Sequence, residues 1–109
     1  MEIELTAENF EAEVINVNLP VIVQFRASWD NACASFSPVF SHMAEKYSDS
    51  IIFGKVNIDN EIILTTKYGI TSVPTLIVFE NGNETARNVG FLTDDEFDAF
   101  IIKYNRPTE

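Results

Sequence analysis

The pattern of apolar and polar residues first identifies the strands of this chain. Residues 21–25 form an almost continuous apolar run, which is typical of a strand buried on both faces. Ile3 and Leu5 alternate with acidic residues in a short strand pattern, and residues 51–58 and 75–79 are rich in strand-forming side chains. These patterns predict four strands, and the segments between them do not show the apolar pattern of a strand.

The pair Asn81-Gly82 is the clearest turn signal in the chain. Asparagine followed by glycine accepts the positive φ angles that a two-residue hairpin turn requires. The pair therefore predicts that residues 75–79 continue into an antiparallel strand over about residues 84–90.

Helical spacing of apolar residues predicts a helix in each segment between the strands. The first spans residues 7–17, with Thr6 as its candidate N-cap. The second spans about residues 31–47. The third starts near Asp59 or Asn60 and ends near residue 69.

Two local signals, prolines and a capping box, add detail to the predicted helices. Pro38 inside the second helix predicts a kink, because its ring removes a backbone donor. Thr93 and Glu96 form a capping box that predicts the start of a last helix, which Pro107 would end. The apolar residues of this last helix are Phe97, Phe100, Ile101 and Tyr104.

The predicted order is βαβαβαββα, over one domain that spans residues 1–109. Alternating strands and helices favour a parallel sheet core with right-handed crossovers, to which the hairpin adds antiparallel edge strands. Because helices then cover both faces of a mixed central sheet, we expect a three-layer α/β/α sandwich.

Charge and composition narrow the classes of partner. Seventeen acidic residues against seven basic ones give a net charge of −10, which argues against nucleic acid and anionic membranes as partners. The apolar runs are too short to span a bilayer, and the acidic N-terminus lacks the apolar core of a signal peptide. With a single cysteine there is no disulfide framework either, so we expect a cytoplasmic protein.

The candidate chemistry lies between the strand at 21–25 and the following helix. The segment there reads Trp29, Asp30, Asn31, Ala32 and Cys33. A tryptophan followed by Cys-x-x-Cys at such a position is typical of a dithiol redox site, and here the first cysteine of that spacing is an aspartate. Since the chain has one cysteine, no intramolecular disulfide can form.

The chain resembles the thioredoxin family over nearly its whole length. The matching features, in register with one another, are the strand Val21–Phe25, Trp29-x-x-x-Cys33, Pro38, Lys55–Asp59, Tyr68-Gly69-Ile70, Val73-Pro74-Thr75, Asn81-Gly82 and Val89-Gly90. The resemblance implies a thioredoxin-like fold. It also implies a redox site whose nucleophile is missing, because Asp30 stands where the family has its attacking thiol.

Asp30 has two interpretations. Aspartate is among the best N-cap residues, so its carboxylate is expected to accept a hydrogen bond from the N–H of Ala32 or Cys33. The alternative is a permanent anion that imitates a thiolate for a partner to recognise.

Cys33 also has more than one interpretation. It lies three residues before Phe36 on the apolar face, where a cysteine packs as a small inert hydrophobe. The charge of Asp30 disfavours its thiolate, and a weakly reactive thiol that forms mixed disulfides is the alternative. A metal site is not expected, because His42, the only histidine, lies about 180° around the helix from Cys33.

Two further positions depart from the family pattern that the resemblance implies. Gln24 replaces a buried acid that helps to deprotonate the second thiol, which leaves Lys55 without that charge partner. Arg26 replaces an aromatic residue, and we expect it to form a weak surface ion pair with Asp30.

The peptide groove of the family, by contrast, is expected to be retained. Val73-Pro74 resembles the cis-proline turn against which thioredoxins pair an extended peptide. The residues expected to line this groove are Trp29, Ile70, Val73, Pro74, Gly90 and Phe91.

The sequence therefore favours a non-catalytic binding or adaptor protein, of a holdase-like kind, whose partners are proteins or extended peptide segments. Two alternatives remain open: a single-thiol redox protein that acts through Cys33, and a structural subunit of a larger complex. A dithiol oxidoreductase would need a cysteine from another molecule. No cofactor or metal is implied.

Overall fold

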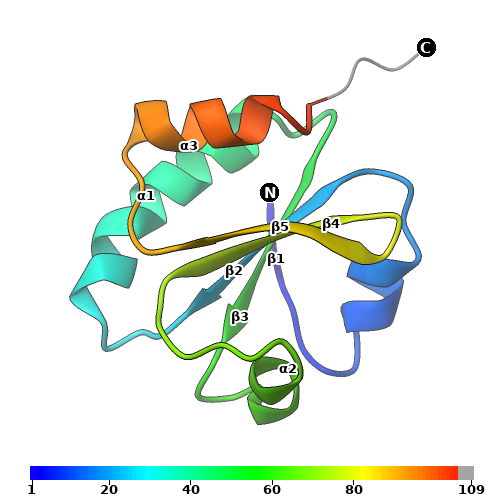
Figure 1. The fold of residues 1–109 in the computed structure, drawn as a ribbon, viewed down its shortest axis with the longest axis vertical. Helices are drawn as coiled ribbons and strands as arrows, with labels where there is room; N and C mark the ends of the chain where they lie inside the picture. The colour runs from blue at the N-terminus through cyan, green and yellow to red at the C-terminus, as the bar shows by residue number, and fades with distance from the viewer. Residues whose placement is uncertain (106–109) are drawn as a thin grey trace.

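A computed structural model describes residues 1–105, which form a five-stranded sheet covered by helices on both faces (Figure 1). The elements in chain order are β1 (Glu2–Glu4), a short π-helix η1 (Glu11–Ile15), β2 (Val21–Arg26), α1 (Asn31–Lys46), β3 (Ile52–Asn57), α2 (Ile62–Lys67), β4 (Thr75–Glu80), β5 (Asn83–Val89) and α3 (Asp94–Ile102). The predicted α/β fold with a mixed central sheet is confirmed.

The strands lie in the order β1-β3-β2-β4-β5. β1 and β2 both pair with β3 in parallel, whereas β4 is antiparallel to β2 and to β5. The expectation that both hairpin strands lie at the edge is wrong, because β4 lies inside the sheet between β2 and β5.

The connection between β3 and β4 contains only a short helix, α2. A helix of six residues rises about 9 Å, whereas a strand of six residues spans about 20 Å. After the short α2, residues 68–74 do not return to the start of β3, and β4 begins at the end of the sheet where β2 and β3 finish.

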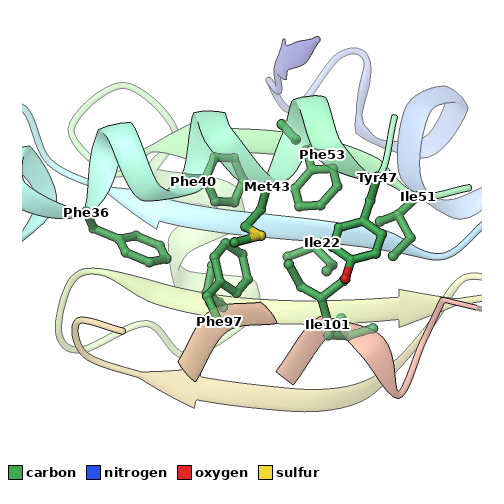
Figure 2. Close-up of a cluster of buried hydrophobic side chains, with 12 residues drawn as sticks. Ile22, Phe36, Phe40, Met43, Tyr47, Ile51, Phe53, Phe97 and Ile101 are labelled. Carbon is green, nitrogen blue, oxygen red and sulfur yellow. The ribbon is translucent and has the colours of Figure 1, made fainter. Parts of the chain in front are cut away.

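Two apolar cores occupy the two faces of the sheet. On one face, α1 and α3 pack their aromatic side chains against β2, β3 and β4, and Figure 2 shows Phe36, Phe40 and Met43 of α1 near Phe97 of α3. On the other face, Phe10, Val14 and Leu64 from the η1 and α2 segments pack on every second side chain of β2 and β4, since successive side chains of a strand point to opposite faces. Together these cores give the predicted three layers.

The two helices on the second face are shorter than predicted. The segment at 7–17 contains a regular helix only over Glu11–Ile15. Thr6 caps the turn before it: its Oγ1 accepts from the Asn9 N–H at 3.3 Å, and its N–H donates to Asn9 Oδ1 at 2.8 Å. α2 starts after residue 60 because the Asn57 side chain accepts from the Asp59 N–H and holds a turn there.

The local signals of the C-terminal third are confirmed. Asn81 and Gly82 have φ angles of 53° and 81°, as the hairpin turn requires. Thr93 and Glu96 form the reciprocal capping box of α3. The expected helix-ending role of Pro107 lies outside the described residues. Within residues 1–105, no helix combines the length and apolar character needed to cross a bilayer.

Candidate functional site

The candidate residues lie at one end of the sheet. Phe25 pairs with Thr75 and Thr75 with Val89, while Arg26 pairs with Asn57. As a result β2, β3 and β5 finish at the end where β4 begins, toward the left and lower part of the view in Figure 1. The loops at this end contain residues 27–30, 58–61, 68–74 and 90–93.

Asp30 is the N-cap of α1. Its backbone is extended (φ −93°, ψ 130°), and its Oδ2 accepts a hydrogen bond from the Cys33 N–H at 2.9 Å. The predicted cap is therefore present. Asn31 and Ala32 form the first turn that this bond closes, which places a carboxylate at the positive end of the helix dipole.

Cys33 is buried in the first turn of α1, with 5% of its surface exposed. Burial raises the pKa of the Cys33 thiol above its ordinary value, and the hydrogen bond and charge of the Asp30 carboxylate raise it further. A hydrogen bond with the Ala27 backbone and the charge of Arg26 act in the opposite direction without reversing the shift. Burial and the Asp30 carboxylate thus both favour the protonated thiol over the thiolate, which is the nucleophilic form.

A small hollow of about 160 Å³ opens beside this thiol. Its lining residues are Arg26, Ala27, Ser28, Cys33, Ala34 and Ser37. A larger hollow of about 590 Å³ lies on the other side of the sheet, between η1, α2 and the hairpin turn, and none of the candidate residues lines it. We assign the chemistry to the smaller hollow because it contains the cysteine.

Arg26 does not form the expected ion pair with Asp30. Within residues 1–105, no basic group lies within 4.0 Å of the Asp30 carboxylate. The carboxylate instead accepts a hydrogen bond from the Cys33 N–H. A surface ion pair with Arg26 would contribute little and does not displace this bond.

Gln24 is buried in the centre of β2, opposite Lys55 on β3. An amide cannot remove a proton from a thiol. Lys55 has no charged group opposite it at position 24, but it has a different charge partner: its Nζ lies 3.6 Å from Glu2 Oε1. β1 pairs with β3 so that Glu4 lies opposite Lys55, and Glu2 projects from the same face of β1 within reach of the lysine.

Trp29 is the most exposed aromatic side chain of the described residues, with 67% of its surface accessible. Its indole N–H donates to Asp59 Oδ2 at 2.8 Å, which links the start of α1 to the loop after β3. Sequence reasoning missed Asp59, because the two residues are thirty positions apart and no local pattern connects them.

The expected groove residues are only partly brought together. The Val73–Pro74 peptide bond is cis, and the Gly90 N–H donates to the Pro74 carbonyl at 2.8 Å. Phe91, 44% exposed, meets Phe36 of α1 edge-on at 6.0 Å between ring centroids. These contacts join the proline loop, the end of β5 and the first turns of α1.

Two of the expected groove residues make other contacts. Ile70 packs against the core on the η1 and α2 face. No hydrogen bond or ring contact among residues 1–105 joins Trp29 to Pro74 or Phe91. The lining of a continuous groove therefore stays a prediction.

The described residues contain no group of three or more metal-ligating side chains. His42 lies 3.5 Å from Asp94 on α3, far along the helix from the buried Cys33.

Comparison with known proteins agrees with this geometry. The sequence model of the thioredoxin family matches residues 1–103. The chain is 38% identical to thioredoxin from Pyropia yezoensis over 101 residues, which covers 93% of this chain and 94% of that protein. It is 36% identical to thioredoxin from Buchnera aphidicola over 99 residues, which covers 91% and 92% of the two chains.

Proposed function

Because the chain belongs to the thioredoxin family but contains a single cysteine, we propose that it binds extended peptide segments of other proteins without dithiol exchange. In this proposal it acts as an adaptor or holdase-like module. Its partners are exposed segments of protein chains.

The site's thiol chemistry supports the absence of exchange. Dithiol exchange requires one thiolate to attack and a second thiol to resolve the mixed disulfide. Asp30 occupies the attacking position, and a carboxylate cannot carry out that step. Cys33 is buried with a raised pKa, and Gln24, which stands where the family has an acid, cannot act as a base.

The backbone of Val73 is the observation that carries the binding role. Within residues 1–105, neither its N–H nor its C=O has a hydrogen-bond partner, although the next residues enter the ladder of β4. An extended peptide that adds as a strand would satisfy both groups. Trp29 and Phe91 leave apolar surface exposed at the same end of the sheet, where side chains of that peptide would pack.

The experiment uses Trp29, the only tryptophan, as an intrinsic fluorescence probe. A short extended peptide of apolar residues is titrated into the protein, alongside the same peptide with its backbone nitrogens methylated. We expect saturable binding of the first and loss of binding for the second, since methylation removes the donors that pair with Val73. Equal binding of both peptides, or of neither, would contradict the proposal.

A matched pair of variants locates the binding surface. Phe91→Ala should weaken binding, because the side chain lies at the same end of the sheet as Val73. Ile102→Ala removes a side chain of similar exposure, 60%, from the last turn of α3 and should leave binding unchanged. An equal effect of the two substitutions would show that the peptide adheres to exposed apolar residues in general.

A single-thiol redox role is the second candidate, and the hollow beside Cys33 is the observation that favours it. In this role the thiolate attacks a glutathione disulfide, so that one glutathione is joined to Cys33 and the other leaves as a thiol. Mass spectrometry after incubation with oxidised glutathione at neutral pH tests it. Rapid, complete modification of the folded protein would favour this candidate, and slow modification favours the binding role.

A further inference from the structure

The face of the Trp29 ring is unoccupied. The ring is 67% exposed, and no other aromatic ring or basic group among residues 1–105 contacts it. Its N–H is bound to Asp59, so the edge of the indole is fixed while its face remains open to solvent. An open tryptophan face is the best side-chain surface for a cation.

One carboxylate lies at the edge of this ring, and another belongs to the adjoining residue. Asp59 accepts the indole hydrogen bond at 2.8 Å and is itself exposed, and Asp30 follows Trp29 directly in the chain. No basic side chain of the described residues lies within 4.0 Å of either carboxylate. The net charge of −10 adds a long-range field of the same sign.

From these observations we propose that the bound segment is cationic, with a lysine or arginine next to the apolar residues that pack at the site. This inference rests on the proposed function, and it specifies the class of peptide. The cationic group lies on the face of Trp29 and pairs with the carboxylate of Asp59.

A cationic segment fits better than the other classes of peptide. An acidic segment would bring like charges together beside Asp30 and Asp59. A neutral apolar segment would remove water from the charged Asp59 carboxylate without supplying an opposite charge, which costs free energy. The same arrangement therefore selects for basic segments and against acidic ones.

Arg26, the nearest basic residue in sequence, does not fulfil this role. It lines the hollow beside Cys33, where its charge lowers the pKa of the thiol, and it lies outside ion-pair distance of Asp30. The charge of the Asp59 carboxylate is thus left for a partner.

The test compares three peptides that share one extended apolar sequence and differ at a single position: lysine, methionine or glutamate. Binding is followed by Trp29 fluorescence and by calorimetry at low and at raised salt. We expect the lysine peptide to bind about threefold to tenfold more tightly than the methionine peptide, and the glutamate peptide to bind more weakly. The preference should shrink at raised salt.

Two substitutions that remove one negative charge each serve as a matched pair. Asp59→Asn keeps an oxygen to accept from the indole but removes the charge, so it should reduce the preference for lysine while methionine-peptide binding persists. Asp95→Asn removes an exposed carboxylate on α3 and should leave the preference unchanged.

The outcomes separate this inference from the proposed function. Equal binding of the lysine and methionine peptides would overturn the inference and leave the proposed function standing. An equal effect of Asp59→Asn and Asp95→Asn would also overturn it, because the preference would then reflect the overall charge alone. Failure of all three peptides to bind would contradict the proposed function itself.

Discussion

The two ends of α1 have different designs. At its C-terminal end, Tyr47 donates to Asp98 of α3 at 2.6 Å, Lys46 pairs with the same carboxylate at 2.9 Å, and Phe40 stacks on Phe97. At its N-terminal end, the Asp30 cap stays within α1, and the neighbouring Trp29 projects into solvent. The C-terminal end of α1 is therefore fixed to α3, whereas the N-terminal end leaves the Trp29 ring exposed to solvent.

The two ends of α1 should differ most in the stability that is lost when an aromatic residue at each end is replaced by alanine. Phe40 is fully buried between β3 and α3, so Phe40→Ala should lower the free energy of unfolding by about 3–5 kcal/mol. Trp29→Ala should cost less than about 1 kcal/mol, because the ring is mostly exposed. Urea denaturation measures both, and similar losses would contradict the division of roles.

Loss of the Asp30 N-cap should have the next largest effect on the free energy of unfolding. Asp30→Ala removes the acceptor for the Cys33 N–H and should lower the free energy of unfolding by about 0.5–2 kcal/mol. Asp30→Asn should retain most of that stability, since asparagine caps equally well. If Asp30→Ala melts like the parent protein, capping does not explain the aspartate, and recognition by a partner becomes the better interpretation.

The contacts of Tyr47 and Lys46 with Asp98, at the C-terminal end of α1, are expected to weaken in acid. Hydrogen bonds from Tyr47 and Lys46 hold the pKa of Asp98 below its ordinary value. Its contribution to stability is therefore present above the pKa of an unfolded aspartate, about 3.9, and is lost as the pH falls through the lower folded value.

Tyr47→Phe measures this contribution directly. The substitution should cost about 1 kcal/mol at pH 7 and progressively less as Asp98 becomes protonated below about pH 4. Thermal unfolding at several pH values provides the measurement. A cost that is the same at pH 7 and pH 3 would show that the ionised carboxylate does not matter.

The smallest expected effect is on the reactivity of Cys33. Asp30→Asn removes the charge that helps to raise the pKa of the thiol, while burial, the larger cause, remains. Alkylation at fixed pH should therefore become only a few-fold faster and stay slower than that of a free thiol, with each pKa unit worth about tenfold in thiolate. Labelling as fast as that of the unfolded chain would contradict the burial argument.

Sequence alone predicted the features that depend on neighbouring residues. The Asn81-Gly82 turn, the capping box at Thr93 and the cap at Asp30 each involve residues within three positions of one another. Their geometry follows from local chemistry, so no knowledge of the packed structure was needed.

The features that were wrong or missed depend on distant parts of the chain. The place of β4 depends on its pairing with β2, and the pair of Lys55 with Glu2 depends on which strand lies beside β3. The bond from Trp29 to Asp59 also joins separate loops at one end of the sheet. Register and loop position decide these contacts, and neither is encoded in a short window of sequence.

The central claim is that this protein binds peptide segments without using its thiol. Its most direct test is the fluorescence titration of a cysteine-free extended peptide into the parent protein and into Cys33→Ser, each with and without a reductant. We expect the same dissociation constant in all four titrations. Loss of binding in Cys33→Ser, or in the presence of the reductant, would show that the sulfur takes part and would contradict the claim.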